Sequence, residues 1–95
     1  MDRTLLDEEV ITSALKNLDG WSYDGSTLQA TFVFENFIQA FGWMSQVALV
    51  AEKMDHHPDW KNVYRTVDVT LNTHDAGGVT ALDLELARTM SGIAS

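Results

Sequence analysis

Apolar residues recur at intervals of three and four in three parts of the chain, and this period is typical of amphipathic helices. The first part covers residues 6–18, with acidic side chains in its first turn and Gly20 after it. The last part follows Thr80 and Asp83, which have the spacing of a capping box, and its stripe comprises Leu82, Leu86, Met90 and Ile93. The pattern therefore predicts a helix near each end of the chain, the first of them ending at Gly20.

The middle helix is predicted to begin at residue 36 or 37, because Asn36 and Gln39 resemble a capping box, and to run to about Met54. His57-Pro58 ends the helical register. The apolar residues of this helix form two stripes, one of Phe37, Phe41, Met44, Ala48 and Ala51 and one of Trp43, Val47, Val50 and Met54. Two stripes present more apolar surface than one sheet face can cover. We therefore expect an oligomer built through this helix, through a sheet edge, or through both.

Two regions have the alternation of β-strands. Trp21–Tyr23 and Leu28–Phe34 flank an Asp24-Gly25 turn, which predicts a hairpin with one buried face. Residues 60–73 are rich in β-branched residues and are expected to form two strands with a break near Arg65 and Thr66; Val63, Val67, Val69 and Leu71 share one parity. The order helix, two strands, helix, two strands, helix predicts an α+β two-layer sandwich: one domain over residues 1–95, with antiparallel hairpins and the helices on one face.

The amino-acid composition limits the kinds of function that the protein can have. The chain has 95 residues, 45% of them apolar, a formal net charge of −8 and no cysteine. This charge argues against direct binding to nucleic acid or to an anionic membrane, and the lack of cysteine excludes disulfides and thiolate chemistry. The longest apolar run, Val47–Ala51, is far too short to span a bilayer. A cytoplasmic enzyme or binding module is the expected class.

The candidate chemistry lies in two polar turns that carry three histidines. His56 and His57 precede Pro58, and His74 lies in a second turn. A metal site is one interpretation, since Glu52, Asp55 and Asp75 are near in sequence, but the spacing supplies no two ligands from one helix face. Acid–base catalysis by imidazoles is the second interpretation. A third makes the middle helix a docking surface through Trp43, Met44, Val47, Val50 and Met54, which does not conflict with catalysis elsewhere.

The sequence resembles the pterin-4a-carbinolamine dehydratase family, also known as dimerisation cofactors of a homeodomain transcription factor. The joint spacing of His-His-Pro-x-Trp over residues 56–60 and of Thr-His-Asp over residues 73–75 is specific, and the likeness spans about residues 20 to 88. Matching segments are Gly20-Trp21, residues 41–44, residues 51–60, Asn62-Val63-Tyr64, Val67, Leu71, residues 73–75, Gly78, Thr80, Asp83 and Leu86-Ala87. The resemblance implies a four-stranded antiparallel sheet and a homodimer or homotetramer.

The activity that the resemblance implies is dehydration of a 4a-hydroxytetrahydropterin to a quinonoid dihydropterin, the step that recycles tetrahydrobiopterin after aromatic amino-acid hydroxylation. No metal or organic cofactor is implied. His56 and His74 are implied as the acid–base pair and His57 as an additional group, with Trp21, Glu52, Asp55, Thr73 and Asp83 as substrate-binding residues. Each of these has a structural alternative, such as hairpin core for Trp21 or helix cap for Asp83. The alternative function is a protein-binding module that modulates the oligomerisation of a transcription factor.

Overall fold

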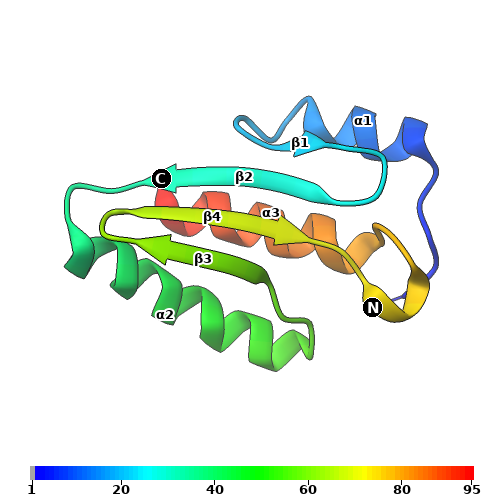
Figure 1. The fold of residues 1–95 in the computed structure, drawn as a ribbon. Helices are drawn as coiled ribbons and strands as arrows, with labels where there is room; N and C mark the ends of the chain where they lie inside the picture. Colours follow the sequence, from blue (N-terminus) through cyan, green and yellow to red (C-terminus); the bar gives the residue numbers. More distant parts are fainter. Residues whose placement is uncertain (1) are drawn as a thin grey trace.

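The computed structural model describes residues 2–95, which form three α-helices, one 3-10 turn and a four-stranded antiparallel sheet (Figure 1). The elements are α1 (Glu8–Leu15), β1 (Ser22–Tyr23), β2 (Leu28–Val33), α2 (Phe37–Met54), β3 (Asp59–Val63), β4 (Thr66–Leu71), η1 (His74–Ala76) and α3 (Ala81–Ala94). The sheet has the order β1-β2-β4-β3. The predicted α+β fold and its element order are confirmed.

The two faces of the sheet differ in polarity because of the strand register. Phe32 of β2 pairs with Val67 of β4, and Ala30 pairs with Val69, so these side chains point to the same face. This inner face also carries Leu28 and Leu71, which are buried. The outer face carries Gln29, Thr31, Asp68 and Thr70, and the Thr31 hydroxyl donates to the Asp68 carboxylate over 2.7 Å. The apolar side of the sheet is thus the side that packs against helices.

The Val63 side chain does not lie on the inner face of the sheet, although Val63 and Val67 have the same parity in the sequence. A two-residue turn pairs Val63 with Thr66 and Asn62 with Val67, so the face reverses across the hairpin. Val63 is therefore 60% exposed.

Helix α2 buries one side against the sheet and α3. Its buried residues are Ala40, Trp43, Val47 and Ala51. The Trp43 ring lies 4.5 Å from the Phe32 ring between centroids, and its Nε1 donates to the Met90 carbonyl over 3.1 Å. Of the two predicted stripes, the one with Trp43 and Val47 faces the core. In the other stripe Ala51 is buried, while Phe37 and Phe41 are exposed.

The first helix is shorter than the sequence predicts. It ends at Leu15, and the chain continues in tight turns in which the amides of Lys16 and Leu18 donate to carbonyls three residues earlier. These turns keep Leu18 buried, so the three- and four-residue spacing of apolar residues continues beyond the end of the helix. Gly20, with φ of 85°, then leads into β1, beside which α1 lies (Figure 1).

The predicted starts of the other two helices are confirmed. The Asn36 side chain accepts a hydrogen bond from the Gln39 backbone amide over 2.8 Å. The Gln39 side-chain oxygen accepts from the backbone amide of Glu35 rather than from that of Asn36. Thr80 and Asp83 form a complete capping box on α3. Within residues 2–95, no helix has both the length and the apolar character needed to cross a bilayer.

Candidate active site

The first histidine turn is set by the C-terminus of α2. Asp55 has left-handed backbone angles, with φ of 53°, and its amide donates to the Glu52 carbonyl over 3.1 Å. The His56 amide donates to the Ala51 carbonyl over 3.0 Å, which completes a Schellman motif. The reversal of chain direction at Asp55 leaves His56 buried and His57 exposed.

The second histidine turn follows β4 and is a small closed loop. The Thr73 amide donates to the Gly78 carbonyl over 2.8 Å, and the amides of Ala76 and Gly77 donate to the Thr73 carbonyl. Thr73 is only 1% exposed, whereas His74 and Asp75 are exposed in η1. The loop therefore presents His74 at the surface and holds Thr73 beneath it.

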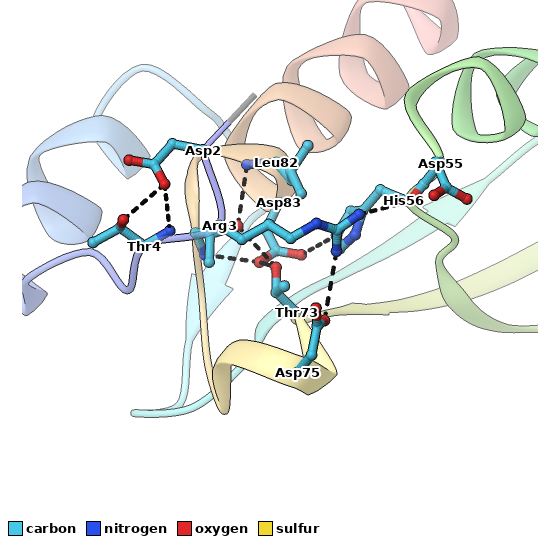
Figure 2. Close-up of polar contacts among 10 residues, drawn as sticks. Asp2, Arg3, Thr4, Asp55, His56, Thr73, Asp75, Leu82 and Asp83 are labelled. Carbon is cyan, nitrogen blue, oxygen red and sulfur yellow. Dashed lines mark hydrogen bonds and ion pairs between the residues drawn. The ribbon is translucent and has the colours of Figure 1, made fainter.

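Asp83, in the first turn of α3, joins the two turns through a buried network (Figure 2). Its Oδ1 lies 2.6 Å from His56 Nε2, and its Oδ2 accepts from the Thr73 hydroxyl and the Thr80 amide, each over 2.9 Å. The Thr80 hydroxyl lies 2.8 Å from the Thr73 hydroxyl. One carboxylate thus connects the end of α2, the end of β4 and the start of α3.

The network determines which nitrogen of His56 is available. Asp83 is 0% exposed and accepts from two other donors, so the His56 Nε2–H is its third donor. A histidine that donates through one nitrogen keeps the other for proton exchange. The arrangement therefore leaves Nδ1 of His56 outside this network and restricts the orientation of the ring.

His57 has a carboxylate partner of its own, but in a different environment. Its Nε2 lies 2.7 Å from Glu52 Oε1, and the two side chains are 59% and 80% exposed. Water competes strongly with such a pair, so it orients the His57 ring less firmly than Asp83 orients that of His56.

Trp21 does not lie with the other candidates. It is 7% exposed, packs edge-on against Phe32, and donates from Nε1 to the Ser91 hydroxyl over 2.8 Å. Ser91 follows Asp83 by eight residues on α3, which corresponds to about 12 Å along the helix axis. Trp21 is thus a core residue some distance from the His56–Asp83 pair.

Two residues that contact this region are not among the candidate site residues indicated by the sequence. The sequence pattern indicates a helix cap at Thr80 but not its contact with Thr73. Arg3 gave no sequence signal, yet its guanidinium lies 3.2 Å from the Asp55 carbonyl and 3.5 Å from the Asp75 carboxylate (Figure 2). Both acceptors belong to residues adjacent to a candidate histidine.

Neither a group of metal-binding side chains nor the hollow on the outer sheet face coincides with these turns. In the described part of the chain, no group of three or more His, Asp and Glu side chains is arranged to hold a metal ion. A hollow of about 510 Å³ lies on the outer sheet face, lined by Gly20, Ser22, Gln29, Ala30, Thr31, Asp68, Val69 and Thr70. Its lining contains no histidine, so this hollow is separate from the two histidine turns.

The fold and the two turns define a small α+β domain in which a buried carboxylate links a histidine to a second histidine-bearing turn. The sequence model of the family described as pterin 4 alpha carbinolamine dehydratase matches residues 4–93. The chain belongs to the pterin-4a-carbinolamine dehydratase family.

Similar proteins agree with this assignment. A provisionally named pterin-4-alpha-carbinolamine dehydratase of Mesorhizobium japonicum is 61% identical over 93 residues, which cover 96% of this chain and 95% of that protein. A protein of Bradyrhizobium sp. with the same provisional name is 60% identical over 92 residues, which cover 95% of this chain and 93% of that protein. A Brucella melitensis crystal structure described as a transcriptional coactivator/pterin dehydratase has a TM-score of 0.91 at 51% identity, over 95% of this chain and 98% of that one.

A more distant structure shares the fold alone. It is a pterin dehydratase-like protein described as a RuBisCO assembly factor in the alpha-carboxysome, with a TM-score of 0.65 at 17% identity over 79% of this chain and 87% of that one.

Proposed function

We propose that this chain dehydrates a 4a-hydroxytetrahydropterin to the quinonoid dihydropterin, and that it serves tetrahydropterin recycling. In this reaction the C4a–O bond breaks and the hydroxyl leaves as water. The N5 proton departs as the C4a=N5 double bond forms. One group must therefore give a proton to the hydroxyl and another must accept the N5 proton.

The observation that carries the proposal is the linkage of the two histidine turns through Asp83. His56 is bonded to Asp83, and Asp83 is bonded to Thr73, the residue before His74. An acid–base pair needs two proton-exchanging groups held around one small substrate. We assign His56 and His74 to this pair and His57, oriented by Glu52, to an additional proton-handling role.

The burial of the candidates separates positioning roles from substrate contact. Asp83 and Thr73 are 0% and 1% exposed, so they have almost no surface with which to touch a pterin. We therefore assign them positioning roles, in place of the substrate contacts expected from the sequence. Glu52 and Asp55 are exposed beside the histidines and keep the expected role in binding. Trp21 is omitted from the site because it packs in the core.

The proposal is tested by the dehydration rate of a synthetic 4a-hydroxytetrahydropterin, followed by the absorbance of the quinonoid product. General acid–base catalysis contributes about 10²–10⁴-fold, so His56→Ala and His74→Ala are each expected to lower kcat by about 10²-fold or more. Glu85→Gln, a change at a half-buried residue of α3, is the matched control. Unchanged kcat in both histidine variants would overturn the proposal.

We also propose that the chain forms a homo-oligomer through an exposed apolar patch on α2. The patch consists of Phe37, Ile38, Phe41 and Leu49, of which Ile38 is 81% and Leu49 76% exposed. Apolar side chains gathered on one helix favour a protein partner. Light scattering at micromolar concentration tests this, and a monomer alone would contradict it.

The alternative function, modulation of a transcription factor's assembly, depends on the same patch. It is favoured by the coactivator description of the Brucella melitensis protein. The patch on α2 would then exchange between copies of this chain and a heterologous helix. A chain with full dehydratase activity whose oligomer never exchanges subunits would contradict that role and leave the catalytic proposal intact.

A further inference from the structure

The segment before α1 lies across the candidate site and is attached to it at several points. We propose that Arg3 in this segment is a positioning residue that holds the two histidine-bearing turns at their working separation. The inference rests on the proposed dehydratase site, because it concerns how that site is assembled. We refer to residues 2–6 as the N-terminal arm.

The arm is attached to the second histidine turn independently of Arg3. The Leu6 amide donates to the Val79 carbonyl over 3.0 Å. Leu5 lies against Gly78 so closely that a Cβ at position 78 would stand 2.9 Å from the Leu5 Cδ2 atom. The arm therefore follows the end of the Thr73–Gly78 loop, and its last residues are held in place by backbone bonding and packing.

The backbone around Arg3 is also constrained, by hydrogen bonds between its two neighbours in the chain. Asp2 Oδ1 accepts from the Thr4 amide over 3.0 Å and from the Thr4 hydroxyl over 2.7 Å, which closes a turn around Arg3. With Leu6 fixed downstream, this turn directs the Arg3 side chain across the site. Figure 2 shows the side chain extending past Asp83 and Thr73 toward Asp55.

The guanidinium contacts both turns at once. Nη2 donates to the Asp55 carbonyl over 3.2 Å, and Nη1 donates to the Asp75 carboxylate over 3.5 Å. Asp55 precedes His56 in the first turn, and Asp75 follows His74 in the second. Because the guanidinium is planar and rigid, its two nitrogens fix the spacing of the two acceptors. A lysine ammonium, which is a single point of charge, cannot reproduce this fork.

Charge gives a second reason for a cation at this place. Exposed carboxylates of Glu52 and Asp55 belong to the end of α2, and the carboxylate of Asp75 belongs to the second turn. Like charges repel, so these groups favour separation of the two turns. The Arg3 guanidinium contacts the Asp75 carboxylate and the Asp55 carbonyl, so its positive charge offsets that repulsion.

The contribution of Arg3 to overall stability is small by the same geometry. Its side chain is 41% exposed and that of Asp75 is 71% exposed, and exposed ion pairs change an equilibrium by about 1.4- to 5-fold. The backbone and packing contacts of Leu5 and Leu6 remain when Arg3 is replaced. We therefore expect substitution of Arg3 to alter the arrangement of the turns without unfolding the chain.

The test compares Arg3→Gln and Arg3→Lys with Arg88→Gln. The control removes an arginine of matched exposure, since Arg88 is 53% exposed and lies 3.7 Å from Glu85 on α3. The first readout is amide hydrogen exchange at Ala76 and Gly77, whose amides donate to the Thr73 carbonyl and report on the second turn. The second readout is the split between kcat and KM for pterin dehydration.

We expect Arg3→Gln to raise exchange at Ala76 and Gly77 and to lower kcat, each by about two- to fivefold, with KM unchanged. Arg3→Lys is expected to restore only part of kcat, and Arg88→Gln to match the parent. Unchanged exchange would overturn the inference, and so would faster exchange with an unchanged kcat. A change confined to KM would make Arg3 a substrate contact, and full rescue by lysine would exclude the fork; both outcomes contradict the proposal.

The two proposals fail in different ways. A parent chain without dehydratase activity overturns the proposed function, while the exchange comparison still measures the link between Arg3 and the second turn. An active parent with an Arg3→Gln variant equal to the control in both readouts overturns the Arg3 inference alone.

Discussion

Replacement of Asp83 by asparagine is the sharpest perturbation of the buried network. Asparagine has almost the same shape, so its side-chain oxygen can still accept from the Thr80 amide and the Thr73 hydroxyl. Its NH₂ group then faces His56 Nε2 in place of a carboxylate oxygen. Two donors cannot share one hydrogen bond, so His56 must move its proton to Nδ1 to keep the contact.

The expected magnitudes follow from this exchange of partners. A hydrogen bond to a charged group contributes about 1.5–3 kcal/mol and a neutral one about 0.5–1.5 kcal/mol, so Asp83→Asn, which removes the charge from the network, should lower the free energy of unfolding by at least about 1–2 kcal/mol. Alanine would leave the His56 ring N–H and the Thr80 amide buried without an acceptor, at about 1–3 kcal/mol each, a large share of the whole stability of a small domain. Asparagine is therefore the informative change.

The effect on catalysis should be much larger than the effect on stability. The same substitution in Ser-His-Asp triads fixes the wrong tautomer and lowers kcat by about 10⁴-fold. For Asp83→Asn we expect a loss of about 10²–10⁴-fold in kcat, because Nδ1 of His56 then carries the proton that it should be free to exchange.

Three measurements check this prediction together. Urea denaturation gives the free energy of unfolding, the dehydration assay gives kcat, and ¹⁵N spectra of the histidine rings give the tautomer of His56. Glu85→Gln is the control, since it neutralises a partly exposed carboxylate on the same helix. A folded Asp83→Asn chain with kcat within twofold of the parent, or with an unchanged His56 tautomer, would refute the reasoning.

The remaining predictions concern the turns and the metal question. Asp55→Gly should raise the free energy of unfolding by about 0.5–1 kcal/mol relative to Asp55→Ala, because φ of 53° is free of strain only for glycine; urea titrations of both variants check this. Hydrogen bonds from the amides of Ser26 and Thr27 and from the Thr27 hydroxyl lower the pKa of Asp24 from 3.8 to about 2. The carboxylate of Asp24 therefore stabilises the fold above about pH 4, and this contribution is lost as the pH falls through about 2. Carboxyl ¹³C chemical shifts measured against pH should give this pKa. Prolonged chelation should leave the dehydration rate unchanged, and a loss that added metal restores would contradict the expectation of a metal-free site. Gly78→Ala should displace Leu5 and lower kcat in the same direction as Arg3→Gln, with a loss of less than about 1 kcal/mol in urea denaturation because the flexible end of Leu5 can move.

Much of the fold was predictable because its signals are local. The capping residues Asn36, Thr80 and Asp83 lie within three residues of the helix starts they define, and the pairing of β1 with β2 follows from a turn signal between them. The end of α1 was placed too late because apolar spacing continues through Leu18. A tight turn and a helix can bury the same residue, so periodicity alone did not separate them.

The candidate site was only partly predictable, because its decisive contacts join distant residues. His56 and Asp83 are separated by 27 positions, and the capping role of Asp83 gave a sufficient local explanation of that residue. Arg3 reaches Asp75 across 72 positions and belongs to no repeating pattern. For Trp21, the sequence offered both a core role and a substrate role, and packing against Phe32 accounts for the first.

The most direct test of the central claim is to map where a reduced pterin binds. The histidine ring resonances and the backbone amide resonances of the intact chain would be followed by NMR while a stable reduced pterin, one that cannot lose water, is titrated in. The account predicts saturable shifts of His56, His57 and His74 at one common affinity, with little change at Gln29 and Thr31 on the outer sheet face. Shifts confined to the outer face, or to one histidine turn without the other, would contradict it.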